Sequence, residues 1–280
     1  MQVAGAFCCK RLASKLKKGA NYLKTEDINL YSPFVAAGTV TGVLHERANR
    51  PGADAFYYET TKSGTIVISV ADGLGSATCG HIGSEITVKE AVFFLKSHLD
   101  RDAERKLPTP GTMKRTVRKA RTSLERYASL KGHSIHDFAT TLLVIAIEGG
   151  SVISAHIGDG AIVGSGDDEI SFISRPEHGE YLNEIVPLTS KEWMNHLRIN
   201  KPKNIFNAIA LFTDGCEGAS LERLDSKRNP LPGFFFPLFT YMKDNKDKRK
   251  VSRDITNFLN SEKMRSSSDD DKTLVLWVSE

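Results

Sequence analysis

The chain has 280 residues, 40% of them hydrophobic and 26% charged, and it carries a formal net charge of +4. This composition is ordinary for a soluble globular protein, and a chain of this length buries enough surface to fold without disulfide or metal staples. The mild positive charge does not by itself indicate nucleic-acid binding, because no dense basic stripe with interleaved aromatic residues occurs.

The cysteines and the N-terminal region indicate the cellular setting. Cys8, Cys9, Cys79 and Cys216 form no C-x-x-C pair and no cluster with histidine, so neither a zinc site nor a disulfide framework is expected. No apolar run reaches membrane-spanning length, and the short apolar run near the N-terminus precedes its basic residues, the reverse of a secretory signal. We therefore expect a reduced, cytoplasmic protein with no stable membrane insertion.

Residues 1–33 are interpreted as a basic N-terminal segment, and residues 34–280 as the folded domain. The segment is rich in lysine, and Leu12 and Leu16 within it lie four residues apart. It is either a short amphipathic helix that contacts an acidic surface or a membrane, or a solvated terminus, which is the simpler interpretation. Its adjacent cysteines are only a weak signal for lipidation.

The folded domain begins with two predicted strands and two predicted helices. Apolar and β-branched residues predict strands at 34–40 and 65–70, with a turn near 49–52 between them. Apolar residues at helical spacing predict a helix over 83–99. After a proline-containing loop, steps of four and three residues predict a second helix, whose stripe is apolar except at its last member: Met113, Val117, Ala120, Leu124, Tyr127 and Lys131. The arginines of this helix lie off the stripe and are interpreted as a solvated face.

The second half of the domain is richer in strands. Gly149-Gly150 predicts a hairpin turn, and Gly158-Asp159-Gly160 predicts a second turn. Residues 254–259 indicate a helix, after a charge-rich loop or helix start at 243–253. Four further strands are predicted, at residues 140–147, 152–157, 161–163 and 205–212. Strands, then two consecutive helices, then more strands indicate an α+β layered domain rather than alternating βαβ units.

Three aspartates beside strand-like runs carry most of the functional information. Asp72 and Asp214 each follow an apolar run, and Asp270 precedes one. Antiparallel pairing would bring all three to the same rim of a sheet. Clustered carboxylates repel one another unless a cation neutralises them, and oxygen-only ligands favour Mg²⁺ or Mn²⁺ over zinc. The pattern therefore predicts a metal-dependent hydrolase.

Five sequence elements in order make the chain from about residue 34 onward resemble the type 2C metal-dependent Ser/Thr protein phosphatases. They are Ala71-Asp72-Gly73-Leu74-Gly75-Ser76, Phe138-Ala139-Thr140-Thr141-Leu142, His156-Ile157-Gly158-Asp159-Gly160, Phe212-Thr213-Asp214-Gly215 and Asp270-Asp271-Lys272-Thr273-Leu274. Residues 178–184 also resemble a segment common in bacterial members. The resemblance implies a four-layer α-β-β-α sandwich with two central, mostly antiparallel sheets flanked by helices.

The resemblance also implies an activity and its cofactors. The expected reaction is hydrolysis of phosphoserine and phosphothreonine in proteins by a water activated between two Mg²⁺ or Mn²⁺ ions. The reaction needs no covalent nucleophile, and the enzyme would oppose a Ser/Thr kinase. Asp72 would bridge the two ions, with the backbone carbonyl of Gly73 completing one site. Asp214 and Asp270 would hold the other ion.

Further residues carry implied roles beside simpler interpretations. Asp54 would orient metal-bound waters. Asp159 matches an aspartate that can help hold a weaker third ion, although a turn or capping role is equally natural there. His45 recurs in bacterial members, and we interpret it as a hydrogen-bonded histidine at the rim. Phe234-Phe235-Phe236 indicates core or flap packing rather than a binding platform.

Several positions depart from the family pattern. Ala53 stands where Glu or Gln often precedes the first acid, which removes a side chain that supports the ions. Leu74 stands where eukaryotic members often have a histidine proposed to protonate the leaving group, so no general acid is assigned. Asn49 stands where an arginine usually grips the phosphate, and Asp271 replaces a usual asparagine, which we treat as a small change. Two nearby arginines, Arg47 and Arg50, are candidates to bind the phosphate in place of the missing arginine.

Two other classes of function are kept as alternatives. Ala53 and the missing arginine suggest a catalytically weak relative that binds a phosphorylated partner as a regulator, and turnover of a generic phosphate ester with Mn²⁺ separates the two hypotheses. A basic nucleic-acid-binding module rests only on the isoelectric point and the lysine-rich start of the chain, and a failure to bind DNA would dismiss it.

Overall fold

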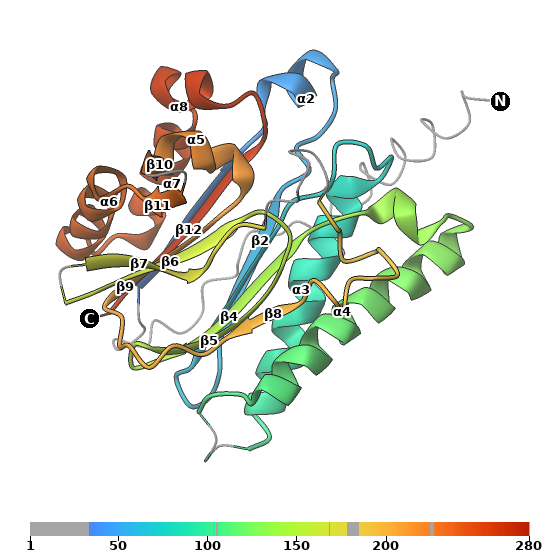
Figure 1. Cartoon of the computed structure of the whole chain (residues 1–280), viewed down its shortest axis with the longest axis horizontal. Helices are drawn as coiled ribbons and strands as arrows, with labels where there is room; N and C mark the ends of the chain where they lie inside the picture. The colour runs from blue at the N-terminus through green and yellow to red at the C-terminus, as the bar shows by residue number, and fades with distance from the viewer. Residues whose placement is uncertain are drawn as a thin grey trace. The chain divides into compact units, whose positions relative to one another are not determined.

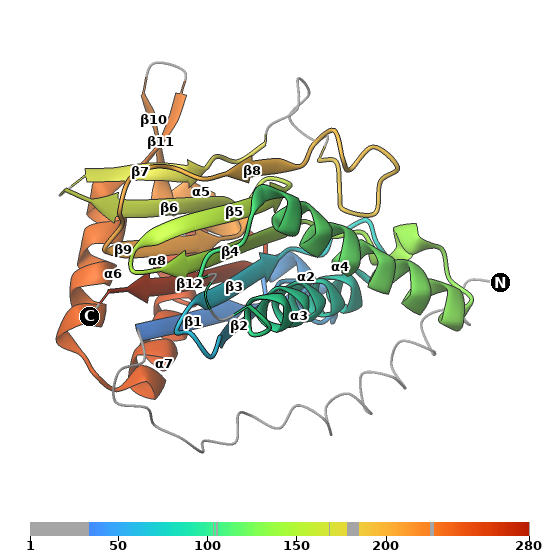
Figure 2. The same cartoon turned by 90° about the horizontal axis from the view of Figure 1, so that it is seen from below.

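Two five-stranded sheets lie face to face, and helices cover their outer faces (Figures 1 and 2). The computed structural model describes residues 34–102, 104, 106–167, 169–177, 185–224 and 227–279. The lysine-rich N-terminal segment, with its two cysteines, and residues 178–184 lie outside the described residues. The layering confirms the α-β-β-α sandwich that the family resemblance implied.

The first sheet has the strand order β1-β12-β9-β6-β7, and each neighbouring pair is antiparallel. Its members are β1 (Phe34–Val40), β6 (Ala161–Gly166), β7 (Glu169–Ser174), β9 (Ala208–Phe212) and β12 (Lys272–Val278). The β1–β12 register runs from Phe34 opposite Val278 to Val40 opposite Lys272. The residues that follow β1 therefore lie beside those that precede β12, although more than 200 residues separate them in sequence.

The second sheet has the order β2-β3-β4-β5-β8 and is also antiparallel throughout its described pairs. Its members are β2 (Ala55–Thr60), β3 (Ile66–Ala71), β4 (Leu142–Glu148), β5 (Ser151–Ile157) and β8 (Arg198–Asn200). Gly149 and Gly150 join β4 to β5 with φ of 53° and 81°, the left-handed region that glycine adopts without steric cost. The predicted hairpin is confirmed.

Strand alternation divides the buried side chains between two layers of core. In β9, Ile209 and Leu211 pack between the two sheets, whereas Ala210 and Phe212 face the helices on the outside. β12 alternates in the same way, with Val275 inside. Because side chains of a strand point alternately to opposite faces, a sheet covered on both sides is built from nearly continuous apolar runs.

Helices α3 (Gly80–Leu99) and α4 (Pro110–Lys131) cover the second sheet. The predicted stripe of α4 is confirmed, because Met113, Val117 and Leu124 are fully buried. Thr109 caps the start of α4, because its Oγ1 accepts from the N–H of Thr112 at 3.1 Å.

Helices α6 (Pro232–Asp244) and α7 (Lys248–Leu259) cover the first sheet, followed by the short α8 (Glu262–Ser267). Phe235 of α6 is fully buried and its ring lies 5.7 Å from that of Phe212, which confirms core packing for this aromatic run. The remaining short elements are α2 (Val43–Arg47), η1 (Ile135–Phe138), η2 (Asp214–Cys216), α5 (Glu217–Ser220), β10 (Leu221–Leu224) and β11 (Lys227–Pro230). None of the helices in the described ranges is both long and apolar enough to cross a bilayer.

Candidate metal centre

The predicted acids come from both sheets and meet at one end of the sandwich. Asp214 follows β9 and Asp270 precedes β12, and these strands pair antiparallel with Leu274 opposite Phe212, so the two acids share a rim. Asp72 instead follows β3 of the second sheet. The expectation that all three acids lie on the rim of one sheet is therefore wrong. They meet across the gap between two stacked sheets, which are only about 10 Å apart in such sandwiches.

The carboxylates are close enough to change one another's protonation. Burial and the charges of Asp54, Asp214, Asp270 and Asp159 hold the pKa of Asp72 well above its ordinary value. Because these carboxylates are shielded from water and repel one another, binding a proton or a cation is favoured over leaving all of them ionised.

The other acids of the cluster show the same effect. Burial, followed by the charges of Asp159 and Asp270, raises the pKa of Asp214 to about 8. Burial is also the largest cause for Asp54, whose pKa is raised to about 7, and for Asp159, whose pKa is raised to about 6. These shifts are those of a carboxylate cluster that lacks a compensating positive charge.

Several oxygens of the cluster have no protein partner. The Oδ1 atoms of Asp54, Asp159 and Asp214 are shielded from solvent and accept no hydrogen bond. Buried acceptors are normally paired, so these oxygens are available to a ligand. An all-oxygen donor set of carboxylates fits a hard divalent cation such as Mg²⁺ or Mn²⁺.

Two threonines fix the backbone of Asp72. Its carbonyl oxygen accepts from Thr140 Oγ1 and from the N–H of Thr141, both at 2.8 Å, and its own N–H donates to Thr141 Oγ1 at 2.9 Å. These bonds tie β3 to the start of β4, where Gly73 forms an isolated bridge with Thr140. A Cβ at Gly73 would overlap the backbone of Gly80, so only glycine lets the loop pass here.

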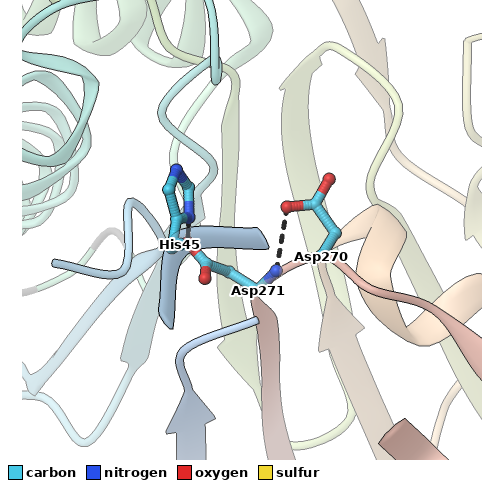
Figure 3. Close-up of side chains that lie close together, drawn as sticks. All are labelled: His45, Asp270 and Asp271. Carbon is cyan, nitrogen blue, oxygen red and sulfur yellow. Dashed lines mark hydrogen bonds and ion pairs between the residues drawn. The ribbon is translucent and has the colours of Figure 1, made fainter. Parts of the chain in front are cut away.

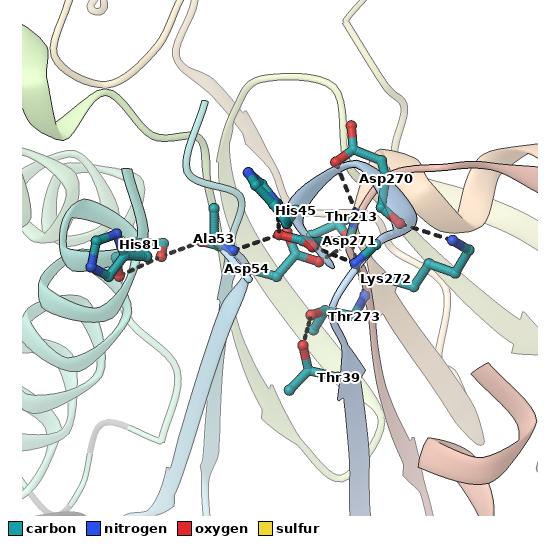
Figure 4. Close-up of polar contacts among 12 residues, drawn as sticks. Thr39, His45, Ala53, Asp54, His81, Thr213, Asp270, Asp271, Lys272 and Thr273 are labelled. Atoms are coloured by element: carbon teal, nitrogen blue, oxygen red, sulfur yellow. Dashed lines mark hydrogen bonds and ion pairs between the residues drawn. The ribbon is translucent and has the colours of Figure 1, made fainter. Parts of the chain in front are cut away.

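A second set of contacts fixes Asp54 and Asp270 (Figure 4). Thr213 Oγ1 donates to Asp54 Oδ2 at 2.7 Å, which links the two sheets. The ammonium of Lys272, which is buried, donates to the carbonyl oxygens of Ser268 and Asp270 at 2.7 and 2.8 Å and so folds the loop before β12. Thr213 and Lys272 lie inside the family motifs, but no sequence signal predicted these roles for them.

His45, Asp270 and Asp271 form a compact group beside this loop (Figure 3). One potential ligand atom from each lies within 4.8 Å of the others. His45 Nδ1 lies 2.8 Å from Asp271 Oδ2, which confirms the prediction of a hydrogen-bonded histidine at the rim. Both oxygens of Asp271 also accept backbone N–H groups, from Gly42 and Ala53, so its carboxylate is already satisfied by the protein.

The predicted phosphate-binding candidates lie on the surface. Arg47, Asn49 and Arg50 are exposed at the end of α2, and Asn49 has a φ of 51°. That Arg47 or Arg50 contacts a phosphate, in place of the arginine that Asn49 replaces, stays a prediction. The arginines of α4 are exposed as predicted, with one difference: Arg121 is half-buried and donates to the carbonyl oxygens of Leu188 and Ser190.

A pocket of about 360 Å³ adjoins Asp214. Glu217 pairs there with Arg228, and burial raises the pKa of Glu217 to about 7. The other lining residues are Gly218, Leu221, Ser267 and Ser268. No sequence pattern singled out this pocket, because its walls come from three separate segments.

The sequence model of the family described as Protein phosphatase 2C matches residues 41–260. The chain belongs to the protein phosphatase 2C family. Membership confirms the family resemblance, and it confirms the predicted enzyme class, protein-serine/threonine phosphatase.

One curated relative and two solved structures resemble the chain. The chain is 27% identical over 249 residues to Serine/threonine-protein phosphatase 3 of Escherichia coli (strain K12), with 87% of this chain and 96% of the relative covered. Serine/threonine phosphatase Stp1 from Staphylococcus aureus superposes with a TM-score of 0.59 at 15% identity, over 92% of this chain and 100% of that chain. The catalytic domain of the phosphatase PstP, solved in complex with two manganese ions, gives 0.56 at 16% identity, over 87% and 96%. The two solved structures show that the fold is shared.

Proposed function

We propose that this phosphatase hydrolyses phosphoserine and phosphothreonine in proteins with the help of two Mg²⁺ or Mn²⁺ ions. The observation that carries the proposal is the convergence of Asp54, Asp72, Asp214 and Asp270 from both sheets. Burial and mutual repulsion raise the pKa values of Asp54, Asp72 and Asp214, and the Oδ1 atoms of Asp54 and Asp214 have no hydrogen-bond partner. The two manganese ions in the related PstP structure support it. A phosphoprotein substrate would make the enzyme the opponent of a Ser/Thr kinase.

Each acid has a proposed place in this site. Asp72 lies among the other acids and is the proposed bridging ligand, with the carbonyl of Gly73 beside it. Asp214 and Asp270, which share a rim, are proposed to hold the second ion. The buried Asp159, with its unpartnered Oδ1, is the proposed ligand of a weaker third ion.

When bound, such a pair of ions supplies a water-derived nucleophile at neutral pH and charge stabilisation for the phosphoryl oxygens. The protein supplies orientation. Asp54 is held at Oδ2 by Thr213, which leaves Oδ1 to accept a hydrogen from a water. Asp270 Oδ1 accepts from the N–H of Asp271 at 2.8 Å, which fixes the carboxylate plane and leaves its other oxygen for a cation.

The organisation of the whole chain is proposed in the same terms. Residues 34–280 would form the catalytic domain, and residues 1–33 a basic segment outside it. The protein would act on phosphoproteins in the cytoplasm.

Substitution of single acids tests the proposal. Asp72→Asn and Asp214→Asn keep the shape of the side chain but remove the charge that holds a cation, so each should lower kcat/KM for a phosphopeptide on the order of 100-fold or more. EDTA should abolish turnover, and added Mn²⁺ should restore it. Asp244→Asn, at an exposed acid at the end of α6, is the matched control and should keep full activity.

The results also separate the enzyme from the alternative of a regulator that binds a phosphorylated partner. Ala53 is buried and offers no side chain to support the ions, which is the observation that favours the regulator. Wild-type protein that binds the phosphopeptide in Mn²⁺ without hydrolysing it would support the regulator. Turnover that survives both chelation and the two substitutions would exclude the metal mechanism.

A further inference from the structure

The carboxylate of Asp271 lies at the junction between the start of β12 and the segment that follows β1 (Figures 3 and 4). Its side chain is only 1% exposed. Three donors point at it: the N–H of Gly42 at 2.6 Å from Oδ1, the N–H of Ala53 at 2.5 Å from Oδ2, and His45 Nδ1 at 2.8 Å from Oδ2. All three come from residues 42–53, so one side chain gathers this whole segment onto β12.

The two backbone donors require a carboxylate at this position. Each oxygen of Asp271 faces one main-chain N–H, and neither N–H can be turned into an acceptor. An ionised carboxylate offers two acceptor oxygens, whereas an amide offers one oxygen and an NH₂ donor. An asparagine would therefore place its NH₂ against Gly42 or against Ala53, whichever way it was flipped, and would leave a buried donor unpaired. Because the carboxylate only accepts, His45 Nδ1 must carry the hydrogen of the third bond.

Ala53 transmits this contact to the other sheet. Its N–H donates to Asp271, while its carbonyl oxygen accepts from the N–H of Gly73 at 3.1 Å and from Ser84 Oγ at 2.5 Å. The residue thus lies between the loop that carries Asp270 and the loop that carries Asp72. Its neighbour in sequence is Asp54.

The fit along the rest of the segment leaves little room for adjustment. A Cβ at Gly42 would overlap the backbone of Asp270, so the two chain segments lie directly against each other. The N–H of Leu44 donates to the carbonyl oxygen of Asp269 at 3.2 Å. A second tie joins the same regions at the surface, where Arg265 pairs with Glu46 at 2.6 Å.

We propose that Asp271 is a positioning residue, whose carboxylate fastens residues 42–53 to β12 and thereby sets Asp54 and Gly73 at the right distance from Asp270. His45 is its third partner and holds the carboxylate in place. The role rests on the proposed function, because it concerns the placement of groups assigned to the ions. In this chain the aspartate is thus a requirement, not a small change from the usual asparagine.

Three variants test the proposal in the full chain. Asp271→Asn removes one acceptor at constant shape, His45→Ala removes one donor, and Arg265→Gln breaks the surface tie between the same two regions as the matched control. For each variant, the hydrogen exchange of residues 42–54 is measured in EDTA. The dissociation constant of Mn²⁺ is measured by calorimetry, and kcat and KM are measured with a phosphopeptide.

Asp271→Asn should speed exchange at Gly42 and Ala53, weaken Mn²⁺ binding about tenfold or more, and lower kcat with little change in KM. His45→Ala should act in the same direction with a smaller effect, and Arg265→Gln should match wild type. Wild-type exchange and Mn²⁺ affinity in Asp271→Asn, or equal losses in Arg265→Gln, would overturn the positioning role.

Two further outcomes are also decisive. If Asp271→Asn does not fold, His45→Ala decides, and unchanged Mn²⁺ affinity in that variant would overturn the role. If wild-type protein shows no turnover, the proposed function fails, but exchange and Mn²⁺ binding still report on positioning.

Discussion

At the scale of single residues, the acidic cluster favours function over the stability of the metal-free protein. Asp54 and Asp214 are drawn together with Asp72 in a place where burial and mutual repulsion raise their pKa values. Such groups destabilise the folded protein whenever they are ionised without a cation. The polar residues around them, such as Thr213 and Lys272, hold the geometry without neutralising the charge.

This arrangement predicts how stability depends on pH. In the folded, metal-free protein the pKa of Asp54 is about 7 and that of Asp214 about 8, against an ordinary 3.8. Between the ordinary pKa and these raised pKa values, the folded state holds protons that the unfolded chain has released. The free energy of unfolding therefore falls as pH rises from about 4 to about 8. His156, buried with a lowered pKa, opposes this only below about pH 6.5.

Chemical denaturation in EDTA and in excess Mn²⁺ measures the effect. Between about pH 6.5 and 8 we expect the free energy of unfolding to decline in EDTA but not in Mn²⁺, because a bound cation takes the place of the protons. Asp214→Asn in EDTA should flatten the decline. If the free energy of unfolding changes with pH equally with and without Mn²⁺, the acids do not repel one another as described.

At the scale of elements, the loop after β3 contains two glycines that differ in their surroundings, Gly73 and Gly75. A Cβ at Gly73 would overlap the backbone of Gly80 at the start of α3, whereas a Cβ at Gly75 would meet nothing within 4 Å. Neither has a positive φ, so the contrast is one of space rather than backbone conformation.

The two glycines give a matched pair of variants. Gly73→Ala should displace the carbonyl beside Asp72 and lower Mn²⁺ affinity and kcat at least about tenfold, with a lower thermal midpoint. Gly75→Ala should leave Mn²⁺ affinity and the midpoint unchanged. Equal effects of the two substitutions would mean that the packing of this loop against α3 does not position the site.

Elements were predictable from sequence where one periodic pattern dominated. The stripe through Met113 and Leu124 defined α4, and the strand at residues 34–40 matches β1. Helix α7 begins earlier than its apolar pattern indicates, because Lys248, Arg249 and Lys250 are all charged. The useful signal is Asp247, whose side chain accepts from the N–H groups of Arg249 and Lys250.

Other elements lacked such a pattern. In α6 the apolar residues surround the helix and Pro237 lies inside it, so no helical stripe stands out. β8 has only three residues, all partly exposed, and gave no strand signal. The acids of the site were recognisable from their motifs, but the role of Asp271 was not, because its three partners lie more than 200 residues away.

At the scale of the whole molecule, the sandwich explains why acids distant in sequence meet. Each sheet contributes strand ends to the same end of the fold: β3 brings Asp72, β9 brings Asp214, and β12 brings Asp270. Strand order is a long-range property, so the sequence motifs could not show that Asp72 belongs to a different sheet from the other two. The site therefore depends on how the two sheets stack.

Anomalous diffraction from crystals grown in Mn²⁺ tests this account most directly. We predict two manganese peaks among the carboxylates of Asp72, Asp214 and Asp270, at the end of the sandwich where both sheets contribute. Saturating Mn²⁺ that gives no peak there, or peaks only elsewhere on the protein, would contradict the central claim that these acids converge to bind divalent cations.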